Sequence, residues 1–229
     1  MGEPVKGKTD AGRRREERAR HRRQRVLDAA LRLFTERGYV AATIEAIARE
    51  AAVAPATVYQ AFGTKQAILA RILDQAITGD AGPAALLERD WVKQARQHPD
   101  PRQRLALVIQ HTSHVAARTA PIKEVMRDAA AADPAVRHLL HEDDQRRYLT
   151  QQALVDLVIG QGPRAGCYRE HAVATFFALV NSHCYQLLAT HLGWSPADWQ
   201  QWLTTVLGRE LLGTSQPARR TPRSGSSTQ

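Results

Sequence analysis

The chain has 229 residues, of which 43% are hydrophobic, and it carries a formal net charge of +9. This length is sufficient to bury a sizeable core, and the positive charge indicates a polyanionic partner, either nucleic acid or an anionic membrane surface. The first residues contain no apolar run of the secretory type, and the longest apolar stretch, residues 173–192, is interrupted by Asn181, Ser182 and His183. These features argue against export and against a membrane-spanning helix, so we expect a cytoplasmic protein with no membrane partner.

Both ends of the chain differ from its middle. Residues 1–20 are rich in Gly, Arg and Glu without apolar periodicity, and residues 214–229 are polar and basic, so we expect a disordered basic arm and a disordered tail. Between them apolar residues recur at helical spacing, and no run of alternating β-branched residues suggests a strand. The sequence therefore predicts an all-α fold, with one helical domain over residues 21–79 and a larger one over residues 80–213.

Signals for helix starts and ends divide the first domain into four helices. A first helix is expected from near His21 to Gly38, a residue that commonly terminates helices. Thr43 stands at the N-cap of a short second helix, Pro55 suits the first position of a third, and Thr64 caps a fourth. Two short helices joined by a tight turn are typical of a helix-turn-helix.

The segment VAPATVYQAFGTK, residues 53–65, supports this interpretation. Its apolar side is formed by Val58 and Phe62, whereas its outer side offers Tyr59 and Gln60 in place of the lysines and glutamates of a solvated helix. A helix that enters the DNA major groove needs such a face, and neighbouring basic residues can supply the attraction to phosphate. The alternative is an ordinary helical hairpin in which these side chains are incidental.

Residues 22–77 resemble the TetR family of bacterial transcriptional repressors. The pattern that carries the resemblance runs through Phe34, Gly38, Thr43, Ile47, Ala48, Val53, Thr57, Tyr59, Phe62 and Lys65. The resemblance implies phosphate contacts at Thr43, Thr57, Tyr59 and Lys65, and base-reading positions at Pro55, Ala56 and Gln60. Ala52 replaces the glycine that is common in the turn, Ala54 replaces a frequent Ser or Thr cap, and Ala61 stands where many members have a polar residue.

The larger domain reads as about five amphipathic helices separated by turn signals at residues 98–101, 119–121, 133–134, 160–163 and 193–196. The family resemblance implies that such a domain holds a ligand pocket and a dimer interface. For the pocket we predict Trp91, Ile109, His111, His114, Met126, Leu154 and Val158. For the interface we predict Phe176, Phe177, Val180, His183, Cys184, Leu187, His191, Trp202, Val206 and Leu207.

The predicted function is that of a ligand-responsive repressor that binds a palindromic operator as a homodimer. A mostly apolar set of residues around Trp91 and Met126, with few acids at inward positions, favours release by a small apolar or aromatic molecule. Two His-x-x-His pairs, at residues 111–114 and 138–141, leave a metal-responsive repressor as an alternative, although the preferred interpretation includes no metal or cofactor. A general nucleoid-binding protein without an effector is the other alternative.

An enzyme is not predicted. Ser113 beside His114, or Cys167 near His171, offers a nucleophile and a base, but no third orienting group accompanies either pair. The two cysteines, Cys167 and Cys184, are too few for a disulfide framework and are expected to be buried free thiols.

Overall fold

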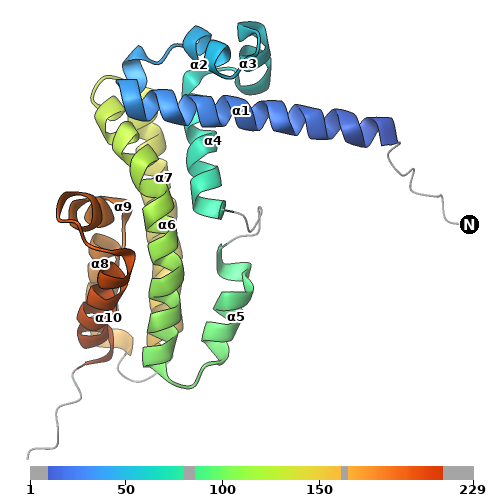
Figure 1. Ribbon diagram of the computed structural model, residues 1–229. Helices are drawn as coiled ribbons and strands as arrows, with labels where there is room; N and C mark the ends of the chain where they lie inside the picture. The colour runs from blue at the N-terminus through green and yellow to red at the C-terminus, as the bar shows by residue number, and fades with distance from the viewer. Residues whose placement is uncertain (1–9, 80–85, 161–164, 214–229) are drawn as a thin grey trace, which may run out of the picture.

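The computed structural model of the chain describes residues 10–79, 86–160 and 165–213, and all of its regular elements in these ranges are helical, as the sequence predicts (Figure 1). The expected tail at residues 214–229 and the first part of the expected arm lie outside the described residues. The helices are α1 Asp10–Ala41, α2 Ile44–Glu50, α3 Pro55–Phe62, α4 Lys65–Thr78, α5 Asp90–Gln97, α6 Pro101–Ala130, α7 Pro134–Ile159, α8 Ala165–Leu179, α9 Ser182–Tyr185 and α10 Pro196–Leu212. The remaining helical elements are a 3-10 helix, η2 Leu86–Glu88, and a π-helix, η3 Gln186–His191.

The first three helices and the start of α4 form one apolar core. The Thr43 and Thr64 hydroxyls accept hydrogen bonds from Ala46 N and Ala67 N, so both predicted N-caps are confirmed. Pro55 begins α3, as predicted. Apolar residues of α2 and α4 are buried together against α1, at the following positions: Ile47, Ala48, Ala51, Ile68, Leu69, Ile72 and Leu73.

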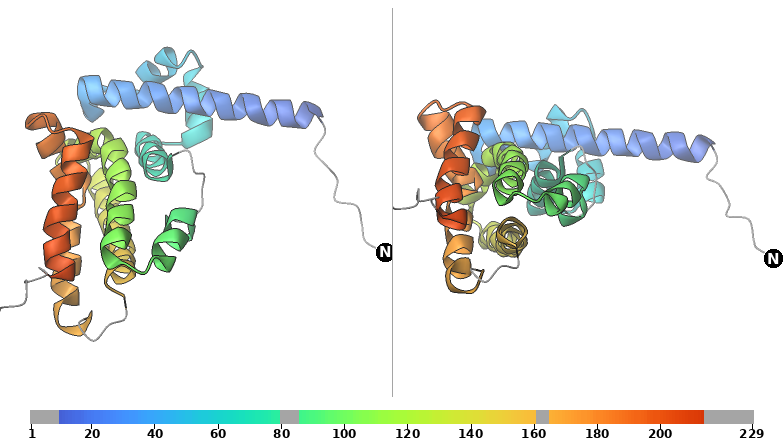
Figure 2. Two further views of the ribbon diagram at one scale, coloured as in Figure 1. Left: turned by 60° about the horizontal axis from the view of Figure 1, so that its bottom comes forward. Right: turned by 90° about the horizontal axis from the view of Figure 1, so that it is seen from below.

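Helix α1 differs from the prediction at its start. It begins at Asp10 instead of near His21, so residues 10–20 of the expected disordered arm are helical. These residues have almost no apolar face, which is why periodicity did not reveal the helix. The predicted terminator behaves as expected, because Gly38 has a φ of 77°, a value outside the helical range, and the helix kinks there. The first half of α1 projects away from the other helices (Figures 1 and 2).

Helices α6 and α7 form a long antiparallel hairpin at the centre of the larger domain (Figure 2). Helix α6 contacts α1, α4, α5, α7, α9 and α10, so it joins the two parts of the molecule. The turn expected at residues 119–121 is wrong, because Pro121 lies inside α6. Its neighbours Ala120 and Ile122 are buried against the rest of the fold, and this packing outweighs the local breaking effect of proline.

The apolar stretch of residues 173–192 is divided at Asn181, where α8 ends and α9 begins. The Asn181 side chain caps α9 by accepting a hydrogen bond from Cys184 N. Across the described ranges, no individual helix has the length and apolar character to cross a membrane, and the segments Arg169–Leu179 and Ser182–His191 reach that threshold only as a pair bent by 47°.

Candidate functional site

The outer face of α3 presents most of the predicted DNA contacts to solvent. Pro55, Ala56 and Gln60 are exposed, the Tyr59 side chain is 50% exposed, and Thr57 is half-buried. Helix α3 is held from beneath by Val58, which is fully buried. The helix therefore offers a polar surface with few long charged side chains, on a rigid support.

Ala52, in the turn between α2 and α3, has a φ of 52°. This left-handed conformation is common for glycine and costs a non-glycine residue about 1 kcal/mol or more. The backbone hydrogen bonds from Ala52 N to Arg49 O and from Val53 N to Ala48 O, at 3.1 and 3.0 Å, hold the turn in this shape. The turn of the helix-turn-helix therefore keeps its shape with alanine, although the positive φ makes its backbone locally strained. Ala54 makes no side-chain cap to α3.

Lys65 has a structural role in addition to its predicted phosphate contact. Its Nζ donates a 2.7 Å hydrogen bond to the Tyr39 carbonyl oxygen and lies 4.1 Å from the centre of the Tyr39 ring. Burial lowers the pKa of Lys65, although the nearby Asp133 carboxylate favours the charged form. Lys65 therefore fixes the start of α4 to the end of α1.

Asp133 joins the smaller domain to the larger one. It caps α7 by accepting a hydrogen bond from Ala135 N, and it also accepts one from the Tyr39 hydroxyl at 3.2 Å and one from Gln66 Nε2 at 2.9 Å. Desolvation alone would raise the pKa of Asp133, but these hydrogen bonds together outweigh it and lower the pKa. Burial, followed by the charge of Asp133, raises the pKa of Tyr39. The cluster of Tyr39, Lys65, Gln66 and Asp133 is called the inter-domain cluster below.

A cavity of about 380 Å³ that is open to the surface on one side lies between α4, α6, α7 and the α8–α9 junction, and it is called the internal cavity below. Apolar groups line much of it, including Ile77, Val115, Ala116, Leu154 and Val180. The same cavity is lined by the charged side chains Arg71, Asp74, Lys123, Asp143, Arg146 and Arg147. Its volume is in the range of small-molecule sites in proteins. One wall belongs to α4, the helix that follows directly on α3.

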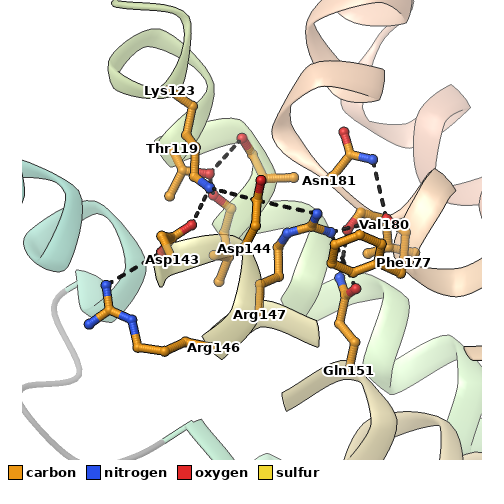
Figure 3. Close-up of polar contacts among 12 residues, drawn as sticks. Thr119, Lys123, Asp143, Asp144, Arg146, Arg147, Gln151, Phe177, Val180 and Asn181 are labelled. Atoms are coloured by element: carbon orange, nitrogen blue, oxygen red, sulfur yellow. Dashed lines mark hydrogen bonds and ion pairs between the residues drawn. The ribbon is translucent and has the colours of Figure 1, made fainter. Parts of the chain in front are cut away.

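Polar side chains of α6 and α7 form a connected network at this cavity (Figure 3). Lys123 and Asp143 make a buried ion pair, with side chains 7% and 5% exposed. Lys123 Nζ also lies 3.5 Å from Asp144 Oδ1. Because both members of the pair are removed from water, each depends on the other for compensation of its charge.

The network continues to the α8–α9 junction. Arg147 donates to the Phe177 carbonyl oxygen at 3.0 Å and lies over the Phe177 ring, and burial lowers its pKa. Gln151 Nε2 donates to the Val180 carbonyl oxygen at 2.7 Å. These bonds satisfy carbonyl groups where α8 ends, so α7 side chains hold that break in place.

The predicted pocket residues have different positions. Leu154 lines the cavity, whereas Ile109, Met126 and Val158 are fully buried in close-packed core. Trp91 is buried and stacks on the His111 ring, with centroids 4.5 Å apart, and burial lowers the pKa of His111. His114 is exposed and does not line the cavity. Among the described residues one acid, Asp143, is buried, and it lies at this cavity in an ion pair with Lys123, in keeping with the expectation of few inward acids.

The predicted interface residues are also divided between core and surface. Phe176, Val180 and Leu207 are buried within the chain itself. The residues left to form an external surface on α9, η3 and α10 are His183, Cys184, Leu187, His191, Trp202 and Val206, and Phe177 is half-buried against Arg147. Leu187 and Leu192 are 42% and 67% exposed. Burial raises the pKa of the Cys184 thiol, which is a free cysteine, and the Cys167 side chain lies outside the described part of the structure.

The second His-x-x-His pair lies on the surface of α7. His138 is 71% exposed and pairs with Glu142 at 3.3 Å, and His141 contacts Gln145 at 2.9 Å. No group of three or more His, Cys, Asp or Glu residues arranged to hold a metal ion occurs within residues 10–79, 86–160 and 165–213.

Comparison with known proteins gives matches in both sequence and fold. Residues 26–72 match the family model of bacterial regulatory proteins of the tetR family. The HTH-type transcriptional regulator HbdR of Aromatoleum sp. (strain CIB) is 50% identical over 48 residues, which are 21% of this chain and 21% of HbdR. The sequence match therefore spans about a fifth of that relative's length.

Two solved structures share the fold along most of the chain. A TetR-family transcriptional regulator from Syntrophomonas wolfei str. Goettingen has a TM-score of 0.67 at 18% identity, over 85% of this chain and 96% of its own. The regulator FadR from Bacillus subtilis, in complex with stearoyl-CoA, has a TM-score of 0.59 at 20% identity, over 83% of this chain and 98% of its own. The all-helical architecture is thus that of these regulators.

Proposed function

We propose that the chain, whose residues 26–72 match the tetR family of bacterial regulatory proteins, is a ligand-responsive transcriptional repressor of that family. It binds a palindromic operator in the cytoplasm as a homodimer, with α3 of each subunit in the major groove. A small, mostly apolar molecule enters the internal cavity and releases the DNA. FadR of Bacillus subtilis, which shares the fold, was solved with stearoyl-CoA, which supports a ligand role for this domain.

The observation that carries the proposal is the composition of the cavity wall. Arg71, Asp74, Ile77 and Thr78 come from α4, and the remaining lining residues come from α6, α7 and the α8–α9 junction. A ligand in this position contacts the helix that supports the helix-turn-helix and the helices of the larger domain at once. Its affinity therefore depends on how α4 is placed relative to the larger domain, and such a difference in affinity between two conformations is what lets an effector shift their equilibrium.

The inter-domain cluster offers a route for this effect. Asp133 lies in the turn between α6 and α7, the two helices that hold the Lys123–Asp143 pair, and its carboxylate accepts hydrogen bonds from Tyr39 and Gln66. A movement of the α6–α7 hairpin thus changes contacts to the ends of α1 and α4. The separation of the two α3 helices in the dimer then changes, and operator affinity falls.

For the dimer interface we propose the exposed surface of η3 and α10 around Leu187 and Trp202. Leu187 is 42% exposed, and Trp194 and Trp202 lie edge to face with centroids 5.8 Å apart on the same side of the chain. Aromatic and aliphatic groups of this kind are enriched at the centres of homodimer interfaces. A twofold axis next to α10 would bring two helices from each subunit together.

The proposal is tested with the full-length chain. Duplexes selected from a random pool should yield a palindromic site that the protein binds as a dimer about a thousandfold more tightly than random DNA. Tyr59→Phe should weaken specific and random DNA by similar factors, because its phenol is assigned to phosphate. A specificity ratio near unity would instead support the nucleoid-binding alternative, and release of DNA by zinc or nickel would support the metal-responsive one.

A further inference from the structure

The charges around the internal cavity are not balanced. Four basic side chains, Arg71, Lys123, Arg146 and Arg147, line it, against the two carboxylates of Asp74 and Asp143. Cationic groups in a site shielded from water raise the local affinity for anions. The charge of the lining therefore favours a negatively charged ligand, provided that these basic groups are not all neutralised by neighbours.

Two of the four basic groups are neutralised within the protein. Lys123 pairs with Asp143 inside the fold, and Arg147 lies 3.4 Å from Asp144, which is outside the cavity lining. Arg147 also has the Phe177 carbonyl oxygen as a partner. The network of α6 and α7 already engages these two side chains, so neither is available as a partner for a ligand.

The other two basic groups remain available. Arg146 lies 3.9 Å from the already paired Asp143 and is 64% exposed. Arg71, an exposed residue of α4, has no hydrogen bond or ion pair with any residue of the described ranges. Asp74 is the single lining carboxylate left to offset them. The mouth of the cavity therefore has an excess of positive charge.

One part of the cavity wall is apolar, beside the buried side chains of Lys123, Asp143, Gln151 and Ser182. Leu154 and Val180 are fully buried there, and Val115 and Ala116 lie beside them on the wall. Thr112 also lines the wall, but its hydroxyl donates to the Val108 carbonyl oxygen at 2.7 Å. The Thr119 hydroxyl likewise donates to the Val115 carbonyl oxygen at 2.8 Å, so both threonines have their hydroxyl groups engaged within α6 and leave their methyl groups for a ligand.

We propose that the ligand of this cavity is an amphipathic organic anion, with a carboxylate or similar acid group at Arg71 and Arg146 and an apolar body against Leu154 and Val180. The guanidinium of an arginine presents paired donors that match a carboxylate. Because Arg71 is on α4, the acid group binds the helix that carries the DNA-binding domain. The inference rests on the proposed function for the location of the site and adds the chemical class of the ligand.

The test is a binding comparison with matched compounds that differ in charge. Full-length protein is titrated calorimetrically with 4-phenylbutyrate and octanoate, and with the primary amide and the primary amine of each. The acids are expected to bind roughly tenfold more tightly than the amides, because a hydrogen bond to a charged group contributes more than one between neutral groups. Equal binding of acids and amides, tighter binding of the amines, or no binding of the acids at about 1 mM would overturn the proposal.

Variants of the protein test which residues cause the preference for acids over amides. The double variant Arg71→Gln, Arg146→Gln should bring the acids and amides within about twofold of each other, chiefly by weakening the acids. Both side chains are exposed, so Tm should change little, which checks that the fold is kept. Arg96→Gln on α5 makes the same kind of change outside the cavity and should retain the preference. Persistence of the full acid preference in the double variant would refute the assignment of these two arginines.

Release of DNA is measured separately in the same solutions. Acids that bind with the expected preference but leave the protein on its operator would support the ligand class and contradict the regulatory role. An amide that releases DNA as well as its acid does would support the regulatory role and contradict the ligand class. The two proposals therefore fail in different experiments.

Discussion

Lys123→Met is predicted to destabilise the protein strongly, because it leaves the Asp143 carboxylate buried without its main partner. Both side chains of the pair are less than a tenth exposed, at 7% and 5%. Removing one member of such a pair typically costs about 3–5 kcal/mol. Arg146, 3.9 Å from Asp143, provides some compensation, so we expect the lower end of the range, about 3 kcal/mol.

Differential scanning calorimetry of the full chain tests this magnitude. For a chain of this length 1 kcal/mol corresponds to roughly 2–4 °C, so Tm should fall by roughly 6–12 °C. Protein concentration is kept constant, since dimerisation makes Tm depend on concentration. The double variant Lys123→Met, Asp143→Leu removes both charges and should restore most of the loss, because an apolar pair of similar volume is tolerated at such sites.

A second lysine provides a matched control. Lys93 pairs with Asp90 at 2.9 Å on α5, but the side chains are 62% and 87% exposed. Lys93→Met should therefore change stability by no more than about 0.5 kcal/mol. If both lysine variants lowered Tm equally, or if the double variant were as unstable as Lys123→Met alone, burial of the pair would not be the cause.

Four further outcomes follow from the geometry. Gln60→Ala should reduce the preference for one base pair in each half-site by about 1–3 kcal/mol. Titration of the variant with the operator and with operators that carry single base-pair changes measures this difference. Ala52→Gly should relieve the positive φ and stabilise the chain by about 1 kcal/mol in chemical denaturation. Leu187→Glu should produce monomers in size-exclusion chromatography, whereas Leu149→Glu, on α7 and 65% exposed, should not. Burial lowers the folded-state pKa of His111, so the folded protein favours the neutral imidazole. The contribution of His111 to the free energy of unfolding is therefore complete above the unfolded pKa of about 6.5 and is lost as the pH falls below it. His111→Phe should make the fall of Tm between about pH 7 and pH 5 less steep.

The helix-turn-helix could be predicted in detail because its signals are local. Thr43, Pro55 and Thr64 act on the first turn of their own helices, and the structure places each where the sequence indicated. The start of α1 was missed for the converse reason, since residues 10–20 have no apolar face that would reveal a helix. Pro121 was misread because tertiary packing on both sides keeps α6 continuous.

The cavity was harder to predict because helical periodicity identifies inward positions but does not distinguish a packed core from a void. Ile109 and Met126 point inward and are packed in the core. Lys123 and Asp143 are residue types usually found on the surface, yet both are buried. One signal was present in the sequence. Lys123 precedes Asp133 by ten residues and Asp143 follows it by ten, so the two face each other in a helical hairpin that turns at Asp133.

In the proposed mechanism, the same hairpin connects the buried ion pair to the DNA-binding helix. At the level of Lys123 and Asp143 the two helices face the cavity, and at the turn Asp133 accepts hydrogen bonds from Tyr39 and Gln66 of the smaller domain. Lys65, three residues after the end of α3, in turn donates to the Tyr39 carbonyl oxygen. Hydrogen-bonded contacts of this kind are directional and lose strength with small displacements, so a ligand that shifts the α6–α7 hairpin as a unit weakens them before it disturbs the apolar cores. The regulatory effect then depends on the rigidity of the hairpin, which the Lys123–Asp143 pair provides.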